Sequence, residues 1–294
     1  MVMLLVSCHK EGVYNPTKKI SRIFSTLSNH YHSEYGDDNY NSGKQLSEVW
    51  TWNKKTLDRI DYYSNNTIFS TVYYTYDKNR LVKMRDGDDL YCEYKYDGNY
   101  LKEVNVYMDN EMVQSYKITH DKSKWSKIEW NVYSDYYMKS DKGEVLNPLR
   151  FVLSDEICQN MKELEKKCYA RKGGKGSWMV TYDLTWEKSN VSKMVVTESD
   201  GSIYTYTYQY DNKNNPFCGC YGIGAWGDGL EVCDMMSKNN MIKSEEQGPD
   251  GYYRNEWDFS YEGKYPISRR HTYSHSGDGY SYSSTQLLEY EYTK

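Results

Sequence analysis

Aromatic and polar residues alternate along most of the chain, in a unit that recurs. In the clearest copy, Tyr94 and Tyr96 stand two positions apart, an acidic residue and a short polar turn follow, and then come Leu101 and Val104. Side chains on a β-strand alternate between its two faces, so the two aromatic residues share one face. The acidic residue, Asp97, favours a turn. Each unit is therefore predicted to be a β-hairpin.

The unit returns six more times, and further turn signals separate the copies. The other copies begin at Trp50, Tyr74, Ile118, Leu184, Tyr208 and Phe259. Repetition of one supersecondary unit predicts a repeat architecture. We therefore expect an all-β fold, in which an antiparallel meander of hairpins curls into an open or closed barrel-like sheet.

Two interruptions divide the repeats. The first, about residues 131–177, contains the one convincing helical pattern, because Ser154 can cap a helix whose apolar residues recur on one stripe. We expect an inserted helix near 154–171 that plugs an opening or covers a face of the sheet. The second interruption, about residues 212–251, contains a glycine-rich loop that lacks the Lys-Ser/Thr pair of a phosphate-binding P-loop.

The glycine-rich loop carries aromatic residues that could stack on a ligand. Tyr221 and Trp226 lie in it, and Trp178 precedes the strand at which the repeats resume. These three residues are our candidate ligand-binding residues. We expect that replacing Tyr221 or Trp226 with alanine weakens ligand binding and leaves stability almost unchanged.

The N-terminus differs from the rest of the chain. Leu5 to Cys8 looks like the lipobox of a bacterial lipoprotein, in which the cysteine is acylated, although seven residues are too few for a complete export signal. The alternative is an ordinary buried strand. Residues 9–44 lack the hairpin unit and are rich in polar residues, which suits a tether. The expected organisation is a truncated signal over 1–8, a lead-in over 9–44 and a single β-meander domain over 45–294.

The seven cysteines allow several arrangements. If Cys8 carries lipid, six remain, an even number that suits an oxidising compartment. The sequence-local disulfide joins Cys220, or its neighbour Cys218, to Cys233. Cys92 shares a strand face with Tyr94, which predicts a buried free thiol. A zinc site on the three clustered cysteines would lack a fourth ligand, so we expect no metal and no cofactor.

Composition limits the partners. The net charge of -5 has interspersed signs and gives no basic stripe, which argues against nucleic acid. The strands alternate tyrosine with Thr, Lys, Glu or Gln, and the mean hydropathy is -0.93, which is unlike the aliphatic outer band of a lipid-spanning barrel. We therefore expect membrane contact only through an N-terminal lipid.

Several motifs together resemble a known family. The YxYD turn followed by NxLxK, the element from Tyr210 to Phe217, the element from Ser237 to Lys243 and the lipobox resemble uncharacterised Bacteroidetes-type lipoproteins with a porin-like fold. The YxYD units also resemble, more weakly, the tyrosine-aspartate repeats of secreted wrapping proteins. The lipoprotein resemblance implies a curled or closed meander sheet, an outer-membrane-anchored location at the periplasmic or cell surface, and no known activity.

Three classes of function are compatible with these features. We expect a monomeric, non-catalytic protein that binds a glycan or a peptide on its tyrosines. The alternative is a structural or accessory lipoprotein that contacts another envelope protein. A hydrolase is a weaker third reading, because it needs converging carboxylates or a nucleophile with its base, and the chain has neither GxSxG nor HExxH.

Overall fold

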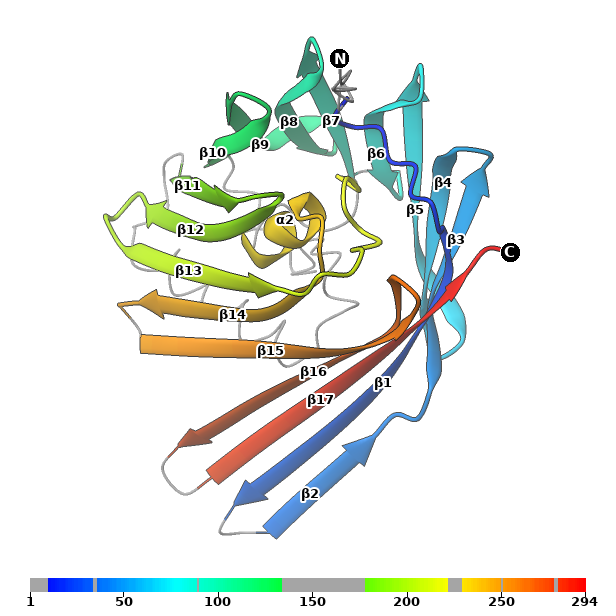
Figure 1. Ribbon diagram of the computed structural model, residues 1–294, viewed down its shortest axis with the longest axis vertical. Helices are drawn as coiled ribbons and strands as arrows, with labels where there is room; N and C mark the ends of the chain where they lie inside the picture. The colour runs from blue at the N-terminus through cyan, green and yellow to red at the C-terminus, as the bar shows by residue number, and fades with distance from the viewer. Residues whose placement is uncertain are drawn as a thin grey trace, which may run out of the picture.

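The computed structural model describes residues 10–33, 36–88, 90–133, 178–221, 229–249, 251–277 and 280–294. Within these residues, 17 strands form one antiparallel sheet (Figure 1). The predicted helix near 154–171 lies outside the described residues. The strands are β1 (Ile20–Ser33), β2 (Gly36–Asn41), β3 (Gln45–Asn53), β4 (Thr56–Ser64), β5 (Thr67–Asp77), β6 (Arg80–Asp86), β7 (Leu90–Asp97), β8 (Tyr100–Met108), β9 (Glu111–Asp121), β10 (Lys124–Val132), β11 (Trp178–Glu187), β12 (Asn190–Glu198), β13 (Ile203–Tyr210), β14 (Met241–Gly248), β15 (Gly251–Glu262), β16 (Tyr265–Gly277) and β17 (Tyr280–Tyr292).

The sheet closes through β1. One edge of β1 pairs with β17, and the other edge pairs first with β3 and then with β2. Because β2 and β3 follow one another along the same edge, the barrel has 16 strand positions. The predicted all-β meander is confirmed, in its closed form.

The first two strands correct one expectation. Residues 20–41 are not a tether, because they form β1 and β2, and Ile20 and Ile23 of β1 are 0% and 2% exposed. Composition misled here because β1 is rich in Ser, Thr and Asn and carries no repeat. The β-domain therefore begins well before residue 45.

Each repeat contains a β-bulge directly after its turn. In the clearest copy Tyr96 pairs with Leu101, but Lys95 pairs with Glu103, so one residue of β8 is extra. Residues three positions apart would face opposite sides of a regular strand, and the bulge places both on the same side. Leu101 and Val104 are accordingly both 0% exposed. The same shift occurs at the second aromatic residue of the other six units.

The second aromatic residue also links neighbouring hairpins. The Tyr96 hydroxyl donates to the carbonyl of Leu81 at 2.7 Å, and the Trp186 indole donates to the carbonyl of Trp125 at 2.7 Å. In both cases the acceptor is the first apolar residue of the preceding unit. Each hairpin is thereby tied to the one before it on the inner face of the barrel.

The two ends of the barrel differ. The turns within the repeats (54–55, 78–79, 98–99, 122–123, 188–189 and 263–264) lie at one end, which we call the plugged end. The turns between repeats (65–66, 87–88, 109–110, 199–202 and 249) lie at the other, the distal end. This separation follows from the antiparallel meander, in which alternate turns fall at opposite ends.

The barrel interior holds a plug, defined as residues 211–221 with residues 229–240, which include α2 (Gly229–Met236). Figure 1 shows α2 inside the ring of strands. The Phe217 ring lies 6.1 Å from that of Trp50 on β3 and 6.0 Å from that of Tyr290 on β17. The Tyr221 ring lies 5.2 Å from that of Trp125 on β10. Contacts with strands spread around the barrel place the plug inside it.

The outer wall carries charged pairs at the positions that alternate with the buried ones. Lys95 pairs with Glu103 at 3.1 Å, and Lys127 pairs with Glu129 at 3.5 Å. Such pairs add little stability. Charged pairs at these outward positions differ from the apolar band that a lipid-spanning barrel carries.

Among the described helices, none has the length and apolar character needed to span a membrane.

Candidate functional site

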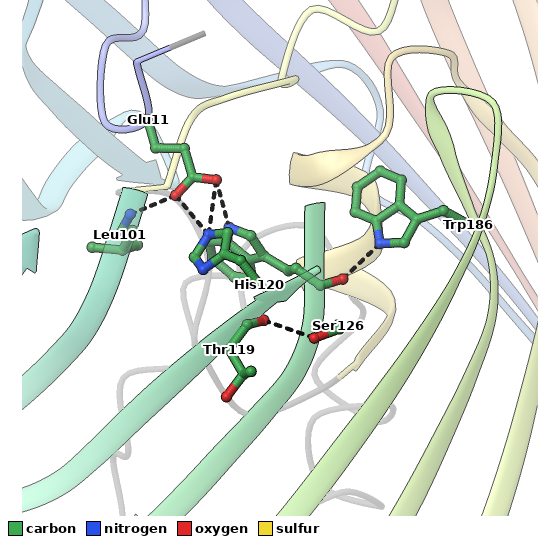
Figure 2. Close-up of polar contacts among 7 residues, drawn as sticks. Glu11, Leu101, Thr119, His120, Ser126 and Trp186 are labelled. Carbon is green, nitrogen blue, oxygen red and sulfur yellow. Dashed lines mark hydrogen bonds and ion pairs between the residues drawn. The ribbon is translucent and has the colours of Figure 1, made fainter. Parts of the chain in front are cut away.

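The plugged end is closed by two segments, and a buried carboxylate holds the first of them. Glu11, which is 3% exposed, accepts hydrogen bonds from the Leu101 amide at 2.5 Å and from the Trp125 indole at 2.9 Å (Figure 2). Both of its oxygens lie 3.2 Å from Nε2 of His120. The N-terminal segment, residues 10–19, is thereby tied to β8, β9 and β10.

Glycine is required beside this carboxylate. Gly12 has φ of +76°, and a Cβ at this position would overlap the Tyr96 hydroxyl. Its carbonyl accepts the amide of Leu81 at 2.8 Å. Two residues on, the Tyr14 hydroxyl donates to the carbonyl of Pro216 at 2.7 Å. The N-terminal segment therefore packs on both the wall and the plug.

Asn215 organises the base of the plug. Its side-chain amide donates to the carbonyls of Asp234 at 2.5 Å and Ser237 at 3.0 Å, and its side-chain oxygen accepts the amide of Phe217 at 2.9 Å. An asparagine can satisfy all of these groups at once because it carries both donors and an acceptor.

Asp211 connects the two elements on which the family resemblance rests. Its carboxylate accepts the backbone amide and the side-chain amide of Asn240, each at 3.1 Å, and also the hydroxyl of Tyr261. The element from Tyr210 to Phe217 and the element from Ser237 to Lys243 are thus the two halves of one hydrogen-bonded base.

Tyr221 lies inside this packing rather than facing solvent. It is 5% exposed, its ring stacks on Trp125, and its carbonyl accepts the Tyr94 hydroxyl at 3.0 Å. Burial raises the pKa of its phenol well above the ordinary value. The expectation that a truncation here leaves stability unchanged is contradicted by these contacts. Trp226 lies outside the described residues, and Trp178 is described only as the first backbone position of β11.

The space beside Tyr221 is too small for a ligand. A cavity of about 10 Å³ lies between the plug and the wall, lined by residues that include Gly12, Tyr14, Tyr76 and Tyr221. This is about the volume that a single water molecule needs. Binding of a glycan or peptide among these residues would require the plug to leave.

None of the four described cysteines forms a disulfide. Cys92 is 5% exposed, as predicted, and burial raises its pKa to about 12. Cys220 and Cys233 are buried, and the disulfide predicted between them is not formed in this structure. Within the part of the chain that is described, no three His, Cys, Asp or Glu side chains are arranged to hold a metal ion. Cys8 lies outside the described residues.

Glu48 is a buried acid that the sequence analysis did not single out. It is 4% exposed, and one of its oxygens accepts the Trp50 indole at 2.7 Å. Burial raises its pKa to about 7, against the opposing effect of this hydrogen bond. Strand alternation could have found it, because Glu48 stands two positions before Trp50 on the same face.

A second buried polar group lies between β15 and β16. The His271 ring stacks on Trp257 at 5.1 Å, and Nε2 of His271 lies 3.1 Å from the side-chain oxygen of Asn255. Burial lowers the pKa of His271 to about 4, so the ring is neutral at pH 7. No signal in the linear sequence distinguishes this histidine from His30, which is exposed.

The distal end presents exposed apolar residues. Among the twelve large apolar side chains that are exposed in the described residues, eight lie at the ends of strands, or directly after them, at this end. Six of them follow the edge from β9 to β15, and we call these six the distal arc. The distal arc comprises Met112, Tyr133, Met179, Ile203, Tyr252 and Tyr253, with exposures from 41% to 55%.

Comparison with known proteins identifies the fold. No protein-family model matches the chain, and no curated protein matches it. A porin-like protein from Bacteroides uniformis superposes with a TM-score of 0.50 at 10% identity, covering 95% of this chain and 100% of its own. This chain has a porin-like β-barrel fold. A porin-like protein from Bacteroides vulgatus gives a TM-score of 0.30 at 10% identity, over 94% of this chain and 99% of its own. The lipoprotein signal and the family resemblance carried by the YxYD units stay predictions.

Proposed function

We propose that the protein is a non-catalytic binding protein of a Gram-negative envelope. Acylation at Cys8 anchors it in the outer membrane, and a glycan or a peptide binds at the distal end of its barrel. The observation that supports this proposal is the contrast between the plugged end and the distal end of the barrel. The plugged end is filled by its own aromatic residues, whereas the distal arc leaves large apolar side chains in water.

The distal arc has the chemistry that a glycan requires. Exposed apolar residues gathered at one end of a protein can form a binding site, and tyrosine rings offer a flat face together with a hydroxyl. Tyr252 and Tyr253 are 54% and 45% exposed at the start of β15. The distal turns add Asp109 and Asp200, whose carboxylates can accept hydrogen bonds from sugar hydroxyls.

The same arc also supports the accessory role as a second candidate. Exposed apolar residues away from the filled end could form the contact surface for a protein partner. The two candidates differ in what binds the arc, so one set of variants tests both.

The test is a binding screen of the full chain carrying Cys8→Ser, so that no lipid is attached. The ligands are polysaccharides and peptidoglycan fragments, and the readouts are tryptophan fluorescence and calorimetry. Replacing both Tyr252 and Tyr253 with alanine should abolish a saturable signal. Tyr73→Ala, which removes a tyrosine that is 43% exposed on the outer wall, should leave binding unchanged.

Two results would contradict the binding proposal. No saturable binding by the folded protein across the panel would exclude it for these ligands. Capture of an envelope protein that is lost in the double tyrosine variant, with no glycan or peptide signal, would establish the accessory role instead.

A further inference from the structure

The turn tips at the plugged end carry a ring of lysines. Each of the six hairpins there ends in a two-residue tip, and five of the six tips contain lysine. No acidic residue occupies a tip itself, although an exposed carboxylate directly precedes five of them: Asp77, Asp97, Asp121, Glu187 and Glu262. The basic ring comprises Lys54, Lys55, Lys78, Lys122, Lys188 and Lys264, all exposed.

The distal tips have the opposite character. In the described distal tips, Asp88, Asp109 and Asp200 are the charged residues, and neither lysine nor arginine occurs. The chain as a whole is acidic, with a net charge of -5. The basic ring is therefore a local feature of one end.

Turn chemistry does not account for these lysines. Lys54, Lys78, Lys122 and Lys188 have φ of 52°, 49°, 57° and 53°, in the left-handed region that favours glycine, asparagine and aspartate. The distal tips use the favoured residues at such positions, with Asn65, Asn66, Asp109 and Asn110. Lysine at the plugged end therefore stands against the conformational preference of the turn.

The six ammonium groups are available to an external anion. None of them forms an ion pair with another of the described residues, in contrast to the paired lysines of the outer wall. Closure of the barrel distributes the hairpin tips around one rim. A rim of separated, flexible cations fits a plane of anions better than it fits a groove-bound strand of nucleic acid.

The N-terminal segment emerges at the same rim. The Glu11 amide donates to the carbonyl of Asn99, which lies in one of the tips, at 3.0 Å. Lys10 directly precedes Glu11, so the first described residue of the chain also lies at this rim.

We propose that the plugged end lies against an anionic membrane surface, with the basic ring bound electrostatically to the lipid headgroups. The distal arc then points away from the membrane. This inference goes beyond the proposed function, because it requires neither acylation of Cys8 nor a ligand at the distal end.

The experiment measures sedimentation of the full chain carrying Cys8→Ser with lipid vesicles. One set contains phosphatidylcholine alone, and the other contains phosphatidylcholine with phosphatidylglycerol. The tip variant replaces four lysines with asparagine, which suits the left-handed conformation and should therefore fold at least as well. The tip variant is Lys54→Asn, Lys78→Asn, Lys122→Asn and Lys188→Asn.

The control removes the same number of charges from the outer wall. The wall variant is Lys95→Gln, Lys117→Gln, Lys127→Gln and Lys193→Gln. We expect binding to the anionic vesicles alone, weakening as salt rises. The tip variant should bind at least about tenfold more weakly, and the wall variant should stay within about twofold of the parent.

Three results would overturn the proposal. These are equal binding to both vesicle types, equal binding by the tip and wall variants, or binding to duplex DNA with none to anionic vesicles. The assay contains no glycan or peptide, so its outcome is separate from that of the ligand screen.

Discussion

Replacing Glu11 with alanine should detach the N-terminal segment from the barrel and lower the free energy of unfolding. The substitution removes the acceptor for the Leu101 amide and the Trp125 indole, and those two residues are 0% and 2% exposed. A hydrogen bond to a charged group contributes about 1.5–3 kcal/mol, and a buried donor left without an acceptor costs about 1–3 kcal/mol. With two such donors, the free energy of unfolding should fall by about 3–6 kcal/mol.

The stability loss of Glu11→Ala cannot exceed the cost of detaching residues 10–19. Once these residues detach, water reaches the two donors, and the remaining cost is the lost packing of Gly12 and Tyr14 on the wall and plug. Glu11→Gln keeps one acceptor oxygen, so it should lose about half as much stability as the alanine variant. Glu129→Ala, which removes an ion-paired carboxylate from the outer wall, should cost less than about 1 kcal/mol.

Urea unfolding with native-state hydrogen exchange separates these cases. The Leu81 amide donates to the carbonyl of Gly12, so its exchange reports directly on attachment of the segment. Faster exchange at Leu81 and Leu101 is expected in Glu11→Ala, with protection of the distal strands kept. A stability loss below about 1 kcal/mol, with exchange unchanged at both amides, would refute the assigned role of Glu11.

Further predictions concern single side chains of the wall and plug. Tyr221→Ala should destabilise by about 3–5 kcal/mol in urea unfolding, whereas Tyr252→Ala should change stability by less than about 0.5 kcal/mol. Tyr96→Phe should cost about 1 kcal/mol, because the Leu81 carbonyl loses its donor. The folded-state pKa of Glu48 is raised to about 7, so its proton stabilises the fold at low pH and that stability is lost as pH rises from about 4.5 to 7. Glu48→Gln should therefore gain up to about 3 kcal/mol relative to the parent between pH 5 and pH 8, and an unchanged difference would contradict the assignment.

The hairpins could be predicted because their determinants are local. Aromatic residues two apart, an acidic residue and a polar turn specify strand, face and reversal within about a dozen positions. The apolar residues three positions apart were the sign of a bulge, which becomes evident only when the pairing of Tyr96 with Leu101 is known. Closure was not predictable in the same way, because it depends on β1 pairing Ile20 with Tyr292 across almost the whole chain.

The plug and the basic ring are also products of long-range contacts. Tyr221 is buried by Trp125 and Tyr94, which lie about a hundred residues earlier and belong to different strands. The lysines show no basic stripe in the sequence because single residues recur in successive hairpins. Only the meander brings them to one end, so charge patterning along the chain could not have revealed the basic ring.

The repeated aromatic residues are best explained by the architecture of the wall. At the second aromatic position the chain uses Trp, Tyr or His in all seven units, whereas the first position also admits Ile118, Leu184 and Phe259. A side chain that must donate a hydrogen bond explains this difference, because Phe has no donor. Tyr96 and Trp186 donate to the preceding hairpin, and Trp52 donates to β1. Tyr261 donates to Asp211 of the plug, whereas the Tyr210 hydroxyl accepts from Ser237 of the plug. Since the wall and plug already use these aromatic groups, the proposed binding depends on residues outside the repeated aromatic pairs. Those residues are the distal arc at one end and the basic ring of turn tips at the other.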